Sequence, residues 1–365
     1  GAAVTEMIPA AKPIIGDEER EAVDRVLRSG MVAQGPEVAA FEQEFGEQLV
    51  SGRRCVAVNS GTSGQHLGLL ATGVGPGDEV IVPSFTFAAT ANSVALTGAT
   101  PVFADIAPDQ FNLDPAAVSA AVTERTVGIM PVHLYGHAAD MPGLTAVAEQ
   151  HGLKIFEDAA QAHGASLDGQ LVGTFGHFAM FSLYPTKNMT SGEGGMVSCV
   201  EEQLARRMRL FRNQGMEKQY ENEVVGLNNR MTDIHAAIGR VQLTKVGAWT
   251  KTRQENAAFL DANLQGVVTP PVAPGAVHVY HQYTIRVPED RDGFAKALRE
   301  EHLVGCGIYY PIPNHRLPSF GLTLDLPETE RAAKEALSLP VHPSLSQDDL
   351  ERIVTAVNAL AGAGA

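Results

Sequence analysis

The sequence predicts an α/β protein with a mostly parallel central sheet in a large domain, followed by a small α+β domain. Three observations support this prediction. Short apolar runs alternate with segments of helical period between residues 55 and 158. The apolar runs are nearly free of polar residues, which is typical of strands covered on both faces. Beyond residue 266 the alternation stops, after a stretch rich in Val, Pro and Gly.

Each element of the first half follows from its pattern. Helices are expected at residues 16–30, which begin with three acidic residues, and 36–49, which carry one apolar stripe. Strands are then expected at 55–58, 79–83, 101–105, 127–134 and 153–158, with helices at 62–73, 86–97, 114–122 and 140–151. Ligands of such sheets bind outside the carboxyl ends of the strands, so residues just after each strand are functional candidates.

The second half begins with two strands around a polar turn, at residues 178–183 and 196–199. Helices are expected at 201–213, 231–246 and 251–264. We place the domain boundary after residue 265, giving a large domain of residues 1–265 and a small domain of residues 266–365. In the small domain we expect strands at 283–287 and 304–310 and helices at 292–301, 328–337 and 347–360.

Composition excludes several classes of function. The formal net charge of -15 argues against nucleic acid or an anionic membrane as a partner, because both need a basic surface. No uncharged stretch has the continuous apolar character of a membrane span. Cys55, Cys199 and Cys306 have neither a disulfide pattern nor metal-site spacing, so we expect a cytoplasmic protein without a metal site.

Lys187 is the first candidate for chemistry. It follows the strand at 178–183 and precedes a glycine-bearing turn, which places an amine at the mouth of a buried sheet. A desolvated ammonium loses its proton easily, and the neutral amine attacks aldehydes. Taken alone, Lys187 is better explained as an exposed loop lysine; the candidate residues upstream reverse this preference.

Asp158 ends the strand at 153–158, 29 residues before Lys187 (187 − 158 = 29). A carboxylate there can pair with a pyridinium nitrogen, although a helix N-cap is the alternative. Gln161 is suited to a ring oxygen or to capping the same turn. His163 is equally compatible with a packed position and a functional one.

A phosphate site is expected where residues 59–64, NSGTSG, follow a strand and open a helix. Free backbone N–H groups at a helix start bind anions, and a plain glycine-containing N-cap is the alternative. Phe87 follows the next strand and offers a ring for stacking or for the core. Together with Ser182, these residues provide a phosphate cradle, a ring face, a carboxylate and an amine. Pyridoxal 5′-phosphate needs this set.

Four segments carry a family resemblance: SGTSGQHLGL, EDAAQAHGA, FSLYPTKNMTSGEGGMV and GLNNRMTDIHAAIGRVQL. They resemble the DegT/DnrJ/EryC1/StrS nucleotide-sugar aminotransferases, over nearly the whole chain. The resemblance implies the fold-type-I architecture of aspartate aminotransferase and a homodimer whose active site is completed across the interface. It implies Lys187 as the Schiff-base lysine, Asp158 on the pyridine nitrogen, Phe87 on the ring and Gln161 near its phenolic oxygen. The phosphate would be held by Thr62, Ser63 and Ser182, together with the neighbour's Asn228 or Arg230; the alternative for Arg230 is a surface salt bridge.

The resemblance also implies a reaction. The family moves an amino group from glutamate, which leaves as 2-oxoglutarate, to a 3- or 4-keto, commonly 6-deoxy, hexose linked to a nucleotide. Sugar dehydratases of the family carry histidine in place of the lysine, so Lys187 favours transamination. Glu193, Tyr310 and His315 resemble residues that line the sugar site, and a Pro-rich packing loop is the alternative for the last two. Gly64 and Gln65 depart from the family's usual Ala-Leu, which we expect to loosen the helix start.

Two other readings stay open at this point. One is a pyridoxal-phosphate enzyme acting on a ketone without a nucleotide, such as a cyclitol or an octulosonate. The other is a non-catalytic sensor, which is disfavoured because the acidic chain shows no basic helix-turn-helix.

Overall fold

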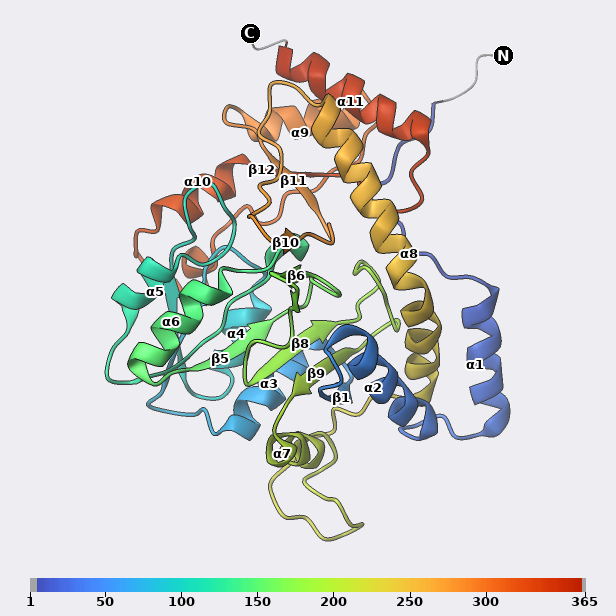
Figure 1. The fold of residues 1–365 in the computed structure, drawn as a ribbon, viewed down its shortest axis with the longest axis vertical. Coiled ribbons are helices and arrows are strands. Elements are labelled where there is room, and N and C mark those ends of the chain that lie inside the picture. The colour runs from blue at the N-terminus through green and yellow to red at the C-terminus, as the bar shows by residue number, and fades with distance from the viewer. Residues whose placement is uncertain (1–4, 363–365) are drawn as a thin grey trace.

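A seven-stranded sheet lies at the centre of the computed structural model, which describes residues 5–362 (Figure 1). The strand order is β1-β9-β8-β5-β4-β2-β3. The strands are β1 (Arg54–Val58), β2 (Glu79–Pro83), β3 (Thr100–Ala104), β4 (Thr126–Ile129), β5 (Lys154–Asp158), β8 (Phe178–Ser182) and β9 (Gly195–Cys199). β9 is antiparallel to both of its neighbours, and all other adjacent strands are parallel. The predicted mostly parallel sheet is confirmed.

Helices cover both faces of this sheet, because its strands carry apolar side chains on both sides. In β2, Ile81 enters one core and Val80 and Val82 enter the other. The first core lies beneath α2 (Pro36–Leu49), α5 (Pro115–Ala121) and α6 (Met141–His151). The second lies beneath α3 (Gly61–Thr72), α4 (Ala89–Ala95) and α7 (Glu202–Arg212).

One long helix replaces the two predicted over residues 231–264. It is α8 (Asp233–Asn263), 31 residues long, against which α1 (Asp17–Ser29) packs at the side of the molecule (Figure 1). The expected break lies near Gly247, which is exposed and has no neighbour within 4 Å of an added Cβ. No proline interrupts this stretch, so the helical hydrogen bonds continue through it.

The C-terminal unit is built on a two-stranded antiparallel sheet, β11 (Tyr283–Arg286) and β12 (Ala336–Leu339). Its helices are α9 (Arg291–Glu300), α10 (Pro327–Glu335) and α11 (Gln347–Gly362). The predicted strand over 304–310 is wrong, because that segment forms only isolated bridges at Val304 and Gly307. The predicted helix over 328–337 ends early, since its last residues begin β12. Such a short apolar run has no period that separates strand from helix.

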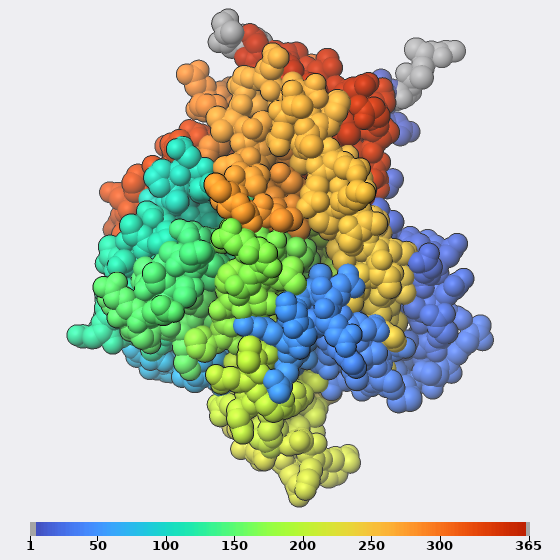
Figure 2. All heavy atoms as spheres, in the orientation of Figure 1, coloured from blue at the N-terminus to red at the C-terminus, as the bar shows by residue number. Residues whose placement is uncertain are grey.

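Short elements complete the chain. β6 (Ser166–Leu167), β7 (Gln170–Leu171) and β10 (Ala276–Val277) form a small sheet, and Leu134–Gly136 and Asn314–Arg316 are 3-10 turns. The strand predicted over 127–134 ends at Ile129, before the first of these turns. The segment between α7 and α8 projects from the body at the bottom of Figures 1 and 2.

The core of the C-terminal unit also takes side chains from α8, among them Ala257 and Leu260. Packing therefore crosses residue 265, and the domain division there stays a prediction. The described part of the chain contains no helix that combines the length and the apolar character needed to cross a membrane.

Candidate active site

Four segments with candidate residues meet at one edge of the central sheet. Asp158 ends β5, Lys187 follows β8, Phe87 follows β2, and α3 begins just after β1. Since these strands are parallel, their carboxyl ends lie at the same edge. Burial raises the pKa of Asp158 and lowers that of Lys187, and the charge of each residue opposes part of the shift of the other. The lysine and the carboxylate are therefore close enough to interact.

Asp158 is a buried carboxylate whose hydrogen bonds come from neutral donors. Thr90 Oγ1 donates to Oδ2 at 2.7 Å, and the Ala160 N–H donates to Oδ1 at 3.1 Å. Burial raises the pKa of Asp158, against the opposing effect of these bonds and of Lys187. Residues 159–165 form turns and no helix, so Asp158 is not a helix N-cap. A buried carboxylate that has only neutral hydrogen-bond donors is suited to pair with a cationic atom of a ligand.

Lys187 lies in the turn that joins β8 to β9. Its backbone N–H donates to the carbonyl of Tyr184 at 3.0 Å, and its side chain is not free in solvent. Burial lowers the pKa of Lys187, and Asp158 offsets part of that effect. A larger fraction of the amine is therefore neutral and nucleophilic near neutral pH than for a surface lysine.

The start of α3 forms an anion cradle. Ser60 caps the helix, since its Oγ accepts the N–H of Ser63 at 3.0 Å. Other N–H groups of the first turn, such as that of Thr62, have no carbonyl to reach within the helix. A Cβ added at Gly61 would lie 3.2 Å from the Cβ of Ser182, so Ser182 borders the helix start. The hydroxyl groups and N–H groups here suit one phosphate.

The departure from the family pattern at Gly64 and Gln65 does not loosen this helix. A Cβ added at Gly64 would approach Val197 Cγ2 to 2.8 Å. Gly64 therefore lets α3 pack directly against the sheet, and the cap at Ser60 is intact.

Phe87, which follows β2, packs beside Tyr310 of the C-terminal unit. The rings of Phe87 and Tyr310 have centroids 6.3 Å apart, and Phe87 is 60% exposed, which leaves its ring open to a planar ligand. Gln161 Nε2 donates to the Tyr310 hydroxyl at 3.1 Å, and Gln161 Oε1 accepts the N–H of Tyr135 at 2.7 Å. Gln161 thus connects Tyr310 with the loop that follows β4.

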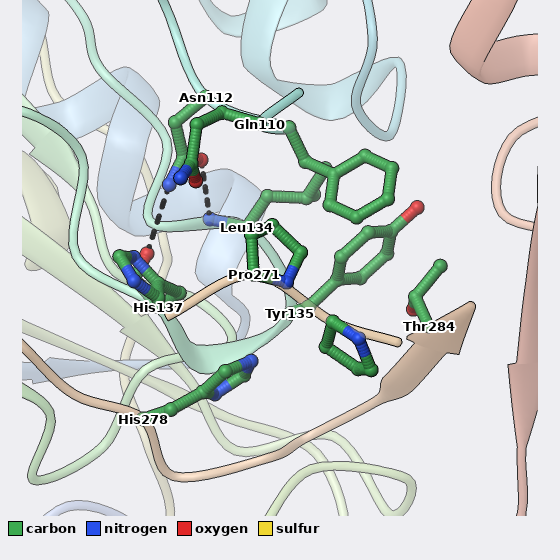
Figure 3. Close-up of a pocket in the computed structure, with 10 residues that line it drawn as sticks. Gln110, Asn112, Leu134, Tyr135, His137, Pro271, His278 and Thr284 are labelled. Atoms are coloured by element: carbon green, nitrogen blue, oxygen red, sulfur yellow. Dashed lines mark hydrogen bonds between the residues drawn. The ribbon is translucent and has the colours of Figure 1, made fainter. Parts of the chain in front are cut away.

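That loop is held by Asn112, as Figure 3 shows. Asn112 accepts the N–H of Leu134 and donates to the carbonyl of His137, both at 3.0 Å. Tyr135 has a φ of 64°, and its hydroxyl donates to the carbonyl of Tyr309. Tyr135 therefore links the sheet edge to the C-terminal unit. The sequence did not indicate this role, because Tyr135 follows an apolar run and its partner Tyr309 is distant in the sequence.

A second buried pair supports Asp158 from behind. Glu157 Oε1 accepts from His133 Nε2 at 2.9 Å and from the Gly173 N–H at 2.8 Å, and Oε2 accepts from the Gly176 N–H at 2.8 Å. Burial would raise the pKa of Glu157, but these bonds outweigh it and hold the pKa below its ordinary value. The His133 N–H donates to the Asp158 carbonyl at 3.0 Å. This support was also missed, although Glu157 is adjacent to Asp158 in the sequence.

Arg230 lies beside the edge strand β1, and Asn228 bridges to Asn213 at the end of α7. Arg230 forms a bridge to Val58, and its Nη1 donates to Asn213 Oδ1 at 2.9 Å. Asn228 is exposed. Within residues 5–362 no carboxylate forms an ion pair with Arg230, which removes the salt-bridge alternative there.

The remaining candidates differ in exposure. Glu193 is exposed on the turn between β8 and β9. His315 is fully buried; its Nδ1 contacts Ser84 Oγ at 2.7 Å and its Nε2 contacts Glu330 at 3.2 Å. Both ring nitrogens are thus occupied, which suits a positioning role for His315. His163 is buried between the rings of Phe45 and Phe181.

A family model, the DegT/DnrJ/EryC1/StrS aminotransferase family, matches residues 13–358. This chain belongs to that family. It is 43% identical to the pleiotropic regulatory protein of Geobacillus stearothermophilus, with 91% of each chain covered. It is 41% identical to dTDP-3-amino-3,4,6-trideoxy-alpha-D-glucose transaminase of Streptomyces venezuelae, covering 96% of this chain and 94% of the relative.

Solved structures of the family agree with this fold. The crystal structure of DesV from S. venezuelae superposes with a TM-score of 0.90 at 40% identity, covering 94% of each chain. The sugar aminotransferase Spr1654 from Streptococcus pneumoniae, in its PLP form, superposes with a TM-score of 0.93 at 26% identity and covers 98% of this chain and 99% of its own. The fold-type-I architecture is therefore confirmed, and aminotransferases of this family use pyridoxal 5′-phosphate.

The residues of this family member fit that cofactor. Asp158 is buried without a cationic hydrogen-bond partner, as a carboxylate facing a pyridinium nitrogen would be. The close approach at Gly61 forms a cradle that a side chain would fill. The amine of Lys187 belongs to the same site as Asp158.

Proposed function

We propose that this aminotransferase moves an amino group from glutamate to a 3- or 4-keto, 6-deoxy hexose linked to a nucleotide. The product would be an amino sugar for a glycan, an antibiotic or a cell surface. The observation that carries the proposal is that a buried Asp158 with neutral hydrogen-bond donors, Lys187 and the start of α3 all follow strands at one edge of the sheet. The named activity of the S. venezuelae relative supports the substrate class.

Each residue has a distinct proposed task. The bound cofactor would supply an aldehyde for the amine and an electron-withdrawing ring. Lys187 would bind that aldehyde and, once released, move a proton to and from the reacting carbon. Asp158 would hold the ring nitrogen protonated, with Thr90 keeping the carboxylate ionised and oriented.

The other cofactor contacts would orient the ring and the phosphate. Phe87 would stack on the ring, and Gln161 would lie near its phenolic oxygen. Thr62, Ser63 and Ser182 would hold the phosphate at the start of α3. All five of these residues follow or end strands at the edge of the sheet where Lys187 lies.

We further propose a homodimer in which Asn228 or Arg230 completes the partner's phosphate site. Arg230 has an amide partner and no carboxylate partner among the described residues, so its charge remains available to a phosphate. The segment before it projects from the body (Figure 2). Tyr220 and Val225 in this segment are 84% and 96% exposed. Such exposed apolar side chains favour burial against another chain. A cytoplasmic location is proposed from the three free cysteines.

Sugar contacts are proposed for Glu193, Tyr310 and His315. Tyr310 is supported by its position beside Phe87 and Gln161. His315 would act through Ser84, because both of its ring nitrogens are occupied. No nucleotide and no position of the ketone is favoured by these residues.

A second candidate is a regulator, because one relative bears the name pleiotropic regulatory protein. The experiment is product analysis of the holoenzyme with glutamate and a panel of dTDP-, UDP- and GDP-linked 3- and 4-keto hexoses, and with keto-cyclitols and keto-octulosonates. We expect an amino sugar from a nucleotide-linked ketone. Amination of a free ketone alone would favour the cyclitol or octulosonate alternative, and no product from any ketone would favour the regulator.

A further inference from the structure

Ser84, His315 and Glu330 form a hydrogen-bonded row at the edge of the candidate active site. Ser84 Oγ lies 2.7 Å from His315 Nδ1, and His315 Nε2 lies 3.2 Å from Glu330 Oε1. The backbone N–H of His315 donates to the same Ser84 Oγ at 2.9 Å. Ser84 and His315 are fully buried, whereas the side chain of Glu330 is 28% exposed. The row therefore runs from the surface of α10 to the loop that follows β2.

This row is not a nucleophile with its base. A serine, a histidine and an acid linked by hydrogen bonds are typical of nucleophilic triads, in which the serine must reach a substrate. Ser84 has no exposed surface, and its Oγ is already bound by two nitrogen atoms of His315. The row can hold a structure in place, but it cannot attack a ligand.

Glu330 determines which ring nitrogen of His315 carries the proton. A carboxylate only accepts hydrogen bonds, so His315 Nε2 must be the donor to Glu330. Burial would raise the pKa of Glu330, but the hydrogen bonds and charges of Arg316 and His315 hold it below its ordinary value, which keeps the acceptor ionised. A neutral ring that is protonated at Nε2 leaves Nδ1 as an acceptor for the hydroxyl of Ser84.

The row ends on the loop that carries Phe87. The N–H of Asn314 donates to the Ser84 carbonyl at 2.9 Å, and Asn314 Nδ2 donates to the Phe87 carbonyl at 3.4 Å. Two adjacent residues of the C-terminal unit, Asn314 and His315, thus bind this loop. The side chain of Phe87 is 60% exposed, so packing alone does not fix its ring. The position of the ring therefore depends on the hydrogen bonds of its loop.

The helix that carries Glu330 is attached to the sheet at its first turn. Asp105 follows β3 and accepts from the N–H groups of Glu328 and Thr329 at 3.0 and 2.8 Å. Asp105 also accepts the hydroxyl of Thr329 at 2.7 Å. Since β3 and β2 are neighbours in the sheet, both ends of the row are attached close to adjacent strands. Glu330 therefore has a fixed position relative to the loop of Phe87.

We propose that Glu330 is a positioning residue of the active site, which acts through His315 and Ser84 to hold Phe87 against the cofactor ring. The inference rests on the proposed function, because the stacking of Phe87 belongs to it. Without Glu330, the proton of His315 could move to Nδ1, and the Ser84 hydroxyl would lose its acceptor. The alternative is that Glu330 only stabilises α10 and the nearby turn through its ion pair with Arg316.

A double-mutant cycle separates these two roles. The dissociation constant of pyridoxal 5′-phosphate is measured by absorbance titration of the apoproteins. We expect it to rise about tenfold in Phe87→Ala and about fivefold in Glu330→Ala. In the double variant the loss should equal that of Phe87→Ala alone, because the effect of Glu330 is transmitted through Phe87.

Two results of the cycle would overturn the proposal. Losses that multiply to about fiftyfold in the double variant would show that Glu330 acts independently of Phe87. An unchanged dissociation constant in Phe87→Ala would remove the residue on which Glu330 is proposed to act.

Amide hydrogen exchange of the apoprotein reports on the loop without any cofactor. Peptides that cover residues 84–90 should exchange severalfold faster in Glu330→Ala than in the parent. Glu330→Gln retains an uncharged acceptor for His315 Nε2 and should restore exchange to within about twofold of the parent. Unchanged exchange in Glu330→Ala would contradict the role of the row.

Glu328→Gln is the matched control for both measurements. Glu328 lies on the same helix, its side chain is 29% exposed, and it pairs with Arg331. Cofactor affinity and exchange of residues 84–90 should be unaltered in this variant. Changes equal to those in Glu330→Ala would mean that any lost charge on α10 has the same effect, which would overturn the assignment to Glu330.

Glu330→Ala should fold, because alanine is favoured in helices and the cap of α10 at Asp105 is retained. Should this variant not fold, Ser84→Ala interrupts the row at its other end and enters the same cycle with Phe87→Ala. Losses that multiply in that cycle would equally overturn the proposal.

Failure of this inference and failure of the proposed function give different results. A wild type that aminates a nucleotide sugar, while the losses in the cycle multiply, refutes only the role of Glu330. A wild type that accepts no nucleotide sugar, while the double variant binds the cofactor as Phe87→Ala does, refutes only the proposed acceptor.

Discussion

Thr90 Oγ1 donates a 2.7 Å hydrogen bond to Asp158 Oδ2, and both side chains are buried. The bond favours the ionised form of Asp158 and lowers its pKa against the effect of burial. Removing it in Thr90→Val should therefore raise the pKa of Asp158, because a hydrogen bond to a charged group is worth roughly 1.5 to 3 kcal/mol.

A higher pKa leaves less Asp158 ionised at a given acidic pH. The acidic limb of the kcat profile should consequently move to higher pH in Thr90→Val, with kcat reduced about tenfold near the limb. The profile is measured between pH 5 and 9, with Thr100→Val on the exposed start of β3 as the control. An acidic limb that stays in place would show that Thr90 does not act through Asp158.

Glu157→Gln should destabilise the fold by about 3 kcal/mol, because it removes a buried carboxylate that accepts hydrogen bonds from His133 and from backbone N–H groups. The new amide NH2 group would also face backbone donors such as the Gly176 N–H. Urea unfolding at pH 7 measures the loss. Glu255→Gln, an exposed change on α8, should stay within about 0.5 kcal/mol of the parent. Equal stabilities for the two variants would contradict the account of Glu157.

Gly61→Ala tests the phosphate cradle. The added Cβ would lie 3.0 Å from Met180 Sδ and 3.2 Å from Ser182 Cβ, which forces the start of α3 away from Ser182. The dissociation constant of pyridoxal 5′-phosphate should rise about tenfold, or by about 1.4 kcal/mol. Absorbance titration of the apoprotein measures it.

Gly247→Ala is the matched control for this change. Its Cβ meets nothing within 4 Å, and alanine in an exposed helix should raise stability by about 0.5 to 1 kcal/mol. Cofactor affinity should be unaltered in this variant. Equal cofactor affinity in Gly61→Ala and Gly247→Ala would exclude the start of α3 as the phosphate site.

Stability should fall in acid because His163 is buried as the neutral form. Neither ring nitrogen makes a hydrogen bond of ordinary geometry, and burial lowers the pKa of His163 from 6.5 to about 3. The unfolded chain therefore takes up a proton as pH falls below 6.5, while the folded chain does not until about pH 3. The free energy of unfolding should decrease over this window by about 1.4 kcal/mol per pH unit for this group.

His163→Asn should reduce the dependence of the free energy of unfolding on pH by the contribution of one proton. His278 and His281, whose pKa values burial also lowers, still contribute to this dependence in the variant. Urea unfolding at pH 5, 6 and 7 gives the two slopes. Parallel slopes for the parent and the variant would mean that His163 is not neutral in the folded protein.

The sequence predicted the sheet well, because an uninterrupted apolar strand such as β2 is stable only when both of its faces are buried. It also indicated Asp158, Lys187 and the start of α3, since each directly follows a strand. Tyr135 and Glu157 were not found, because their roles depend on contacts with residues distant in sequence. The two helices predicted over residues 231–246 and 251–264 form the single helix α8, because no proline interrupts the backbone hydrogen bonds between them.

The central claim is that Lys187 binds the cofactor aldehyde beside Asp158. The most direct measurement is the visible spectrum of the purified holoenzyme before and after borohydride, for the parent and for Lys187→Ala. The parent should show a visible band that borohydride abolishes while fixing the cofactor to the peptide containing Lys187, and Lys187→Ala should show no such band. An unchanged band in Lys187→Ala, or a label on another lysine, would contradict the account.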